Sequence, residues 1–158
     1  MKKFLPYIKY FAVFLFGIVI LCTTNELLDE LLSAPEKIEI DGREFILETY
    51  LVRDFFPPCP PGGRPLAAVI TVIAIDSLQF PYSLDADYLW IIKDDEVWGT
   101  ELIDYEGSSS AYELKKLSKD EGPKWGPKIY VDAVVRVVDD EDNNYLLRAA
   151  DQWIHRTE

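Results

Sequence analysis

The sequence contains few of the residues that soft metals and nucleophilic catalysis require. Among its 158 residues are one histidine, one methionine and two cysteines. So few soft ligands argue against a copper carrier. A serine nucleophile would need His155 as its base, but the serines at 108–110 lie in a glycine-serine run and not at a turn from a strand into a helix. The sequence therefore predicts no cofactor, no bound metal and no serine hydrolase.

The two cysteines differ in their surroundings, and we do not expect them to form a disulfide with each other. Cys22 ends an apolar run, whereas Cys59 lies among prolines. In an oxidising compartment, Cys59 is either a small buried residue or a thiol available for an intermolecular bridge.

Basic residues are also scarce, with 16 Lys and Arg against 28 Asp and Glu. The first 34 residues hold three charges of each sign, so the net charge of −12 belongs entirely to residues 35–158. Such a surface repels nucleic acid and anionic lipid, and no nucleic-acid partner is expected. The acidity favours either solubility or a specific basic partner.

Only one apolar run approaches membrane length, and it lies near the N-terminus. Residues 10–22 contain no charge, lysines precede them and acids follow them. This asymmetry predicts a cytoplasmic N-terminus and an extracytoplasmic location for the rest of the chain. The run is shorter than the roughly 20 residues that span a bilayer, but it reaches that length if it starts at Phe4 and Lys9 snorkels to the headgroups.

Two kinds of membrane tether fit residues 1–22. The segment is either an uncleaved signal anchor or a lipoprotein-type signal with lipid on Cys22. Val19, Ile20 and Cys22 resemble a bacterial lipoprotein signal, whereas Leu21 departs from it because the residue before the cysteine is normally small. Release of a soluble chain is not expected, since no small residues mark a cleavage site.

Residues 23–34 are expected to form a short helical stalk before the folded domain. Thr23–Glu26 has the spacing of a capping box, and leucines then recur at helical intervals until Pro35. The remaining residues, 35–158, are enough for one domain with its own core.

Strand patterns dominate residues 35–158, and three hairpins are predicted. Asp41-Gly42 supplies the positive φ angles of a tight turn between strands at 36–40 and 43–51. A second hairpin pairs 88–93 with 96–103, and a third pairs 128–139 with 145–154.

The predicted fold is an antiparallel immunoglobulin-like β-sandwich of seven or eight strands, preceded by an N-terminal hydrophobic helix. No helix of normal length is expected after Pro35. Residues 55–65 hold five prolines and are predicted to be a loop or crossover. Residues 66–75 are apolar at nearly every position, which predicts a central strand covered on both faces.

Three phrases of the sequence resemble small uncharacterised bacterial proteins. These phrases are Glu48–Asp54, Ala86–Trp90 and Asp151–Ile154. The strand order has a proline-rich crossover and a strand led by Tyr130 that pairs with the C-terminal strand. It resembles the immunoglobulin-like sandwiches of bacterial surface and periplasmic proteins, including small membrane-anchored and lipoprotein-like proteins. The resemblance implies that fold and no activity. The chain departs from antibody-type domains because it lacks paired cysteines around a core tryptophan.

An acidic turn at 139–144 offers the oxygen ligands that calcium prefers. The sixth position of a calcium loop counted from Asp140 needs glycine, but Tyr145 stands there. A solvated hairpin turn is therefore predicted.

Loops at the ends of a rigid β scaffold are the predicted contact surfaces. Cys59 and Arg64 in the proline loop, and Trp125 in the loop 122–127, are the candidate partner contacts. The Trp125 ring either packs on the sheet or is displayed to a partner.

The expected function is a non-catalytic binding or assembly module, tethered to a membrane with its domain in the periplasm or on the cell surface, with an envelope protein as partner. One alternative is an envelope enzyme that acts on glycans through paired carboxylates. A small-ligand or ion-binding lipoprotein is the other.

Overall fold

The computed structural model describes residues 26–158 and divides the chain into two units, Met1–Ser33 and Ala34–Glu158. In the first unit, residues 26–33 form a helix that ends before Pro35, as predicted. The tether at 1–22 with its lipidation candidate Cys22, and the capping residues 23–25, lie outside the described residues. Within 26–158, no helix has the length and apolar character needed to cross a bilayer.

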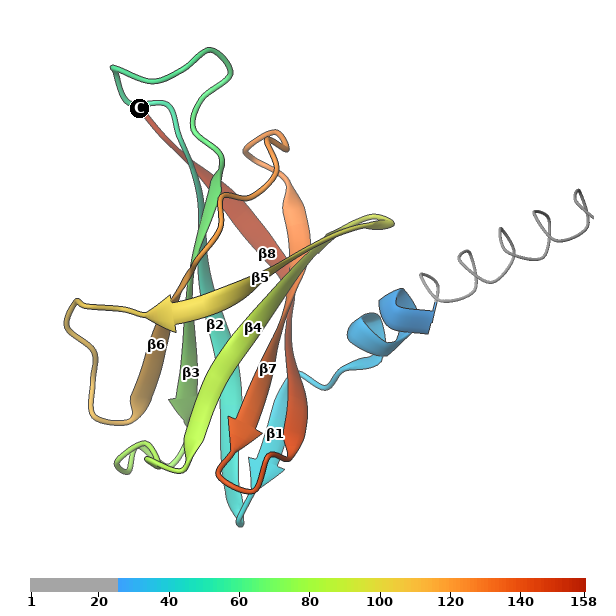
Figure 1. Cartoon of the computed structure of the whole chain (residues 1–158), viewed down its shortest axis with the longest axis vertical. Coiled ribbons are helices and arrows are strands. Elements are labelled where there is room, and N and C mark those ends of the chain that lie inside the picture. The colour runs from blue at the N-terminus through green and yellow to red at the C-terminus, as the bar shows by residue number, and fades with distance from the viewer. Residues whose placement is uncertain (1–25) are drawn as a thin grey trace, which may run out of the picture. The chain divides into compact units, whose positions relative to one another are not determined.

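The second unit is built from strands (Figure 1). They are β1 (Lys37–Ile40), β2 (Arg43–Asp54), β3 (Leu66–Ala74), β4 (Leu84–Lys93), β5 (Glu96–Asp104), β6 (Glu113–Ser118), β7 (Tyr130–Asp139) and β8 (Asn144–Thr157).

The three predicted hairpins are confirmed. β1 and β2 meet at Asp41 and Gly42, whose φ angles of 52° and 74° are those of a tight hairpin turn. β4 turns into β5 at Asp94, with φ 55°, and β7 pairs with β8 across the acidic turn. Residues 55–65 contain no strand, as their prolines predict.

The predicted antiparallel immunoglobulin-like sandwich is wrong, because the sheet closes into a mixed barrel of seven strands. β2 pairs antiparallel with β3, and its last residues, Leu51–Asp54, pair in parallel with Ile154–Thr157 of β8. β1 pairs only with the first part of β2. A barrel and a sandwich share the same inward and outward alternation along each strand, so the pattern did not separate them.

A bend in β8 accompanies this closure. Asp151 has a φ of 53°, and its amide donates to the Asp132 carboxylate at 2.9 Å. The register of β7 against β8 shifts at this point, between Val131 and Ala133. Such a bulge increases the local twist of a strand. Beyond it, β8 also pairs with β2.

The barrel interior is a packed apolar core. Its most fully buried side chains come from five strands, and include Phe45, Leu51, Ile70, Val72, Leu89, Ile91, Val135, Leu147 and Ile154. Because apolar side chains fill the interior, candidate functional residues are sought on the wall and at the ends of the barrel.

The strand predicted over 66–75 is present as β3, but only one of its faces is covered. Alternate residues from Leu66 to Ala74 are buried, whereas the outward residues Val69, Thr71 and Ile73 are partly exposed. The expectation of a strand covered on both faces is therefore wrong for the described chain. Outward β-branched residues made β3 look like a buried strand.

Candidate ligand pocket between β4 and β6

The barrel wall has a seam where β5 changes neighbours. The first part of β5 pairs with β4 from Tyr88 to Lys93, and only its last residues, Leu102–Asp104, pair with β6. The start of β4, from Leu84 to Asp87, therefore has no ladder on this edge, since its only paired neighbour there is β7.

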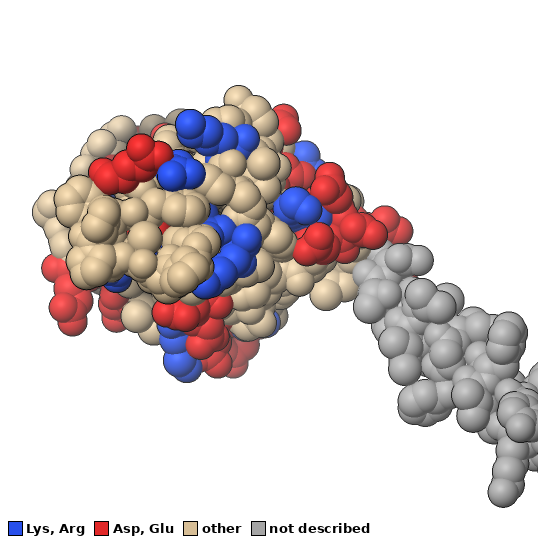
Figure 2. Space-filling view, turned by 90° about the horizontal axis from the view of Figure 1, so that it is seen from above, with Lys and Arg blue, Asp and Glu red and all other residues tan. Residues whose placement is uncertain are grey.

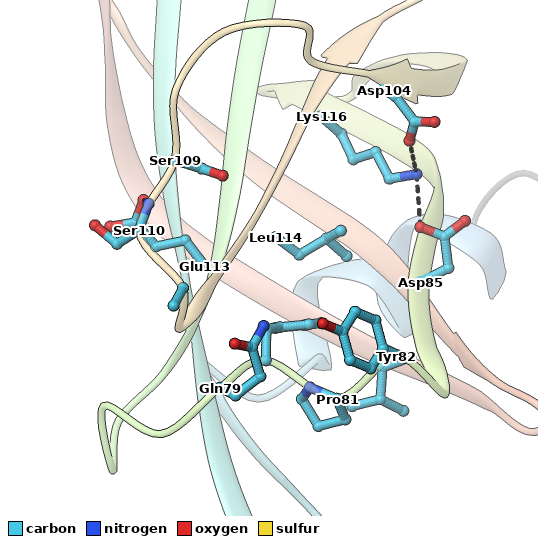
Figure 3. Close-up of a pocket in the computed structure, with 13 residues that line it drawn as sticks. Gln79, Pro81, Tyr82, Asp85, Asp104, Ser109, Ser110, Glu113, Leu114 and Lys116 are labelled. Atoms are coloured by element: carbon cyan, nitrogen blue, oxygen red, sulfur yellow. Dashed lines mark hydrogen bonds and ion pairs between the residues drawn. The ribbon is translucent and has the colours of Figure 1, made fainter.

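A pocket of about 520 Å³ opens at this seam (Figure 3). Its lining comes from the start of β4, the end of β5, β6 and two loops, and consists of Gln79, Phe80, Pro81, Tyr82, Leu84, Asp85, Asp104, Ser109, Ser110, Ala111, Glu113, Leu114 and Lys116. The volume falls within the range of about 300–1,000 Å³ that is usual for small-molecule sites.

The two loops that form the mouth of the pocket are held in place by hydrogen bonds. The Phe80 amide donates to the Ala111 carbonyl at 2.8 Å, which joins the β3–β4 loop to the β5–β6 loop. Arg43 donates to Asp76 at 2.7 Å and to the Gln79 carbonyl at 3.0 Å. The Arg43 hydrogen bonds, followed by a bond from the Leu78 amide, lower the pKa of Asp76 to about 2.

Lys116 lies at the back of the pocket, and its side chain is 7% exposed. Its ammonium donates to Asp85 of β4 and to Asp104 of β5, each at 2.6 Å, and so spans the seam (Figure 3). Burial opposes the charged form of Lys116, but the two carboxylates outweigh it and raise the pKa of Lys116. Lys116 therefore stays charged, its charge is compensated by the two carboxylates, and its role is structural.

The rest of the lining is acidic and partly aromatic. Two carboxylates, from Asp85 and Asp104, meet the one ammonium of Lys116, which leaves an excess of negative charge. Glu113 lies across the pocket, where it accepts from the Ser110 amide at 3.1 Å and is 3.9 Å from the Lys115 ammonium. Tyr82 is 95% exposed at the mouth. A ring displayed beside carboxylates provides both a π face and hydrogen-bond acceptors.

Asp85 and Asp104 are a close pair of carboxylates, the kind of pair that glycan hydrolysis uses. One oxygen of each lies within hydrogen-bond distance of the Lys116 ammonium nitrogen. Hydrolysis also needs one of the two to hold a proton near neutral pH. The hydrogen bond from Lys116 lowers the pKa of Asp104 instead. Asp104 is therefore suited to holding a charge and not to donating a proton.

The sequence did not reveal this pocket. Lys116 occupies an inward position of β6, so Glu113–Ser118 shows no apolar alternation, and the strand itself was not predicted. The acids at 85 and 104 lie at the ends of predicted strands among many other acids. The one available signal was the pair of lysines, Lys115 and Lys116, between Leu114 and Leu117.

The predicted contact residues Cys59, Arg64 and Trp125 lie at the other end of the barrel, where β2 ends and β3 begins. Figure 2 shows this end, where basic and acidic side chains border a broad uncharged area. Arg53 ties the two loops together here, because its guanidinium donates to the carbonyls of Gly62, Arg64 and Trp125.

Trp125 is partly buried and packs against the core. Its indole donates to Glu96 at 2.8 Å, and the Lys93 ammonium lies 6.0 Å from the ring centre. The ring thus packs on the β4–β5 hairpin, which was one of the two expected placements. Its role in partner contact stays a prediction.

Arg64 and Cys59 are anchored within the proline loop. Arg64 is exposed and lies 3.3 Å from the Asp54 carboxylate. Cys59 is a free thiol that donates to the Phe55 carbonyl at 3.3 Å. Gly63, with a φ of 77°, lies so close to Phe55 that any side chain there would clash with the ring.

The acidic turn at 139–144 is held by its own hydrogen bonds. Asp139 accepts hydrogen bonds from the amides of Glu141 and Asn143 and from the Tyr145 hydroxyl. Residues 26–158 contain no group of three or more side chains placed to hold a metal.

The chain matches no model of a protein family, and no curated protein or solved structure matches it.

Proposed function

We propose that the protein is a non-catalytic binding module, tethered on the extracytoplasmic side of a membrane, whose β4–β6 pocket receives a small organic cation such as a polyamine. The carrying observation is the excess of carboxylates over the one ammonium in the pocket. Because two carboxylates already compensate the charge of Lys116, a bound amine would meet hydrogen-bond acceptors and no uncompensated positive charge.

Two further features support a cationic ligand. The chain carries a net charge of −12, which attracts cations and raises their local concentration. Tyr82 displays its ring at the mouth, where it can contact an ammonium through its π face.

The tether is supported by the sequence of residues 1–22, with lysines before an uncharged apolar run and acids after it. A non-catalytic role is supported by the lowered pKa of Asp104, which makes this carboxyl a poor proton donor.

Titration calorimetry of the full chain in a mild detergent tests the pocket with spermidine as the probe and sorbitol as an uncharged control. We expect saturable binding of spermidine alone. Asp104→Asn should weaken it about tenfold, as expected for a lost charge-assisted hydrogen bond. Asp140→Asn removes one exposed acid from the β7–β8 turn and should leave the affinity unchanged.

Equal weakening by both variants would mean that spermidine responds only to total charge, and the pocket proposal would fail. Binding of sorbitol with the same affinity would also contradict it, because the ligand class would then be hydroxylated and neutral.

A further inference from the structure

The outer side of β2, β3 and β6 carries apolar side chains that the described chain leaves uncovered. Six of them, Ile46, Tyr50, Val52, Val69, Ile73 and Leu117, define what we call the outer face. All six are partly or fully exposed, and Figure 1 shows β3 between β2 and β6. Monomeric proteins rarely expose a contiguous apolar patch of this extent without a use for it.

The strand register makes the outer face continuous. Tyr50 is paired with Val69, and Val69 is paired with Leu117 on the far strand. One row of apolar side chains therefore crosses three strands.

Aromatic rings extend this row beyond β2. The ring of His155 stacks on Tyr50 with centres 5.2 Å apart, and Trp153, two residues earlier on the same side of β8, lies 4.7 Å from Tyr130. Tyr50, Tyr130 and Trp153 are 48%, 64% and 37% exposed.

Charge is nearly absent from the centre of the outer face and present at its ends. Glu48 and Lys115 are the outward charges between the apolar rows, and they offset each other. Glu113, which is paired with Ile73 at the edge of the face, lies 3.9 Å from the Lys115 ammonium. Lys37 pairs with Glu44 at 2.7 Å at one end of β2, and Arg64 pairs with Asp54 at 3.3 Å at the other. An apolar centre with a polar rim is the usual anatomy of a protein interface.

We propose that the outer face is the contact between two copies of this chain, packed face to face through a two-fold axis. The remaining surface is strongly acidic, so two copies would repel each other through it. The outer face has no net charge in its centre and can meet an identical face without that cost. Small residues flank its large ones, because Ala67 and Thr71 lie diagonally beside Tyr50, which lets two copies interlock.

The outer face also has the extent of a modest contact. The β2–β3 ladder is about 30 Å long, and β6 and β8 flank it over five and four paired residues. The resulting area, on the order of 400 Å², is about half of the roughly 800 Å² that each partner gives to a standard interface.

Light scattering combined with size-exclusion chromatography tests the contact on the full chain in a mild detergent. We expect the protein mass in the particle to be twice the 18.2 kDa of one chain. Val69→Lys places a charge in the centre of the outer face and should give the mass of one chain. Val97→Lys makes the same change at an exposed strand position of β5, away from the outer face, and should keep the doubled mass.

Tyr50→Glu serves as a second variant. The Tyr50 ring is half exposed, so its loss should disturb folding less than a change at the partly buried Val69. This variant should also give the mass of one chain. Circular dichroism confirms that each variant is folded. A wild-type chain of single mass at about 100 μM overturns the proposal. So does a doubled mass in the folded Val69→Lys and Tyr50→Glu variants, because association would then run through another surface.

Discussion

Arg53 is a buried cation that has no carboxylate partner among residues 26–158. The residue is 2% exposed, and its guanidinium is held by three main-chain carbonyls, from Gly62, Arg64 and Trp125. Burial lowers the pKa of Arg53. A planar group with five donors can satisfy three fixed carbonyls at once, which a lysine cannot do in the same geometry.

Replacing Arg53 should therefore destabilise the whole proline-loop end. Arg53→Met leaves three carbonyls without their donor and should lower the free energy of unfolding by about 3 kcal/mol. Urea denaturation followed by circular dichroism measures this. Arg64→Met, which removes an exposed arginine of the same loop, should cost less than about 1 kcal/mol. Equal effects of the two changes would contradict the role of Arg53.

Trp125 combines packing with one hydrogen bond, and two substitutions separate them. Trp125→Ala removes a partly buried ring and should cost about 3 kcal/mol. Trp125→Phe keeps most of the ring but loses the bond to Glu96, and should cost about 1 kcal/mol. Denaturant unfolding distinguishes these values. A cost below about 1 kcal/mol for the alanine variant would instead indicate a displayed ring.

Asp76 should resist protonation because Arg43 holds its charged form. The Arg43 hydrogen bonds, followed by the Leu78 amide, lower its pKa from 3.8 to about 2. A carboxyl with a lowered folded-state pKa stabilises the fold above its unfolded pKa, and this stabilisation is lost as the pH falls from 3.8 to about 2.

Carboxyl-carbon NMR titration measures the pKa of Asp76 directly. Arg43→Gln should raise it toward 3.8, whereas Arg156→Gln, at the other end of the barrel, should leave it unchanged. A titration midpoint near 3.8 in the wild-type protein would show that Arg43 does not hold the carboxylate.

The seam between β4 and β6 is a part of the barrel wall where no ladder joins the neighbouring strands. The Ala86 amide has no strand partner on that edge and donates to the Asp85 side chain at 2.8 Å, whereas Leu89 and Ile91 lie between two paired strands. Backbone groups outside a ladder exchange with solvent at lower energetic cost.

Hydrogen exchange measured by NMR should therefore be faster at Ala86 than at Ile91. Asp85→Ala removes the amide's acceptor and one partner of Lys116, so exchange at Ala86 should accelerate further while Ile91 stays protected. Equal protection of both amides in the wild-type protein would be inconsistent with an open seam.

The elements that the sequence predicts are those with local signals. Asp41-Gly42, the prolines of 55–65 and the alternation after Lys128 each act over a few residues, and all three predictions agree with the structure. β6 was missed because Lys116 points inward, and the closure of β2 on β8 was missed because no local feature marks a parallel pair so distant in sequence. The pocket was hidden for the same reason, since it exists only where these elements meet.

The whole molecule joins an acidic domain to a predicted membrane tether. Residues 34–158 form a compact unit with its own core, so they should fold alone and give a strand-dominated circular dichroism spectrum. The full chain should remain with membranes after a carbonate wash, because apolar burial and not charge holds it.

Fractionation of both forms, detected by antibody, checks this prediction. The chain without residues 1–33 should be recovered in the soluble fraction. Intact mass then separates the tethers, since loss of residues 1–21 with added acyl mass indicates lipid on Cys22. Recovery of the full chain in the soluble fraction would contradict the predicted tether.

The parallel contact between β2 and β8 also constrains when the barrel can form during synthesis. Thr49 and Gln152, which bond across this closure, are 103 residues apart. At about 5–20 residues per second, β2 waits roughly 5–20 s for β8 to be made. During that time the last part of β2 presents an unpaired strand edge. A chain crossing a membrane in an extended form would therefore arrive with its N-terminal strands in need of protection until the closing strand follows.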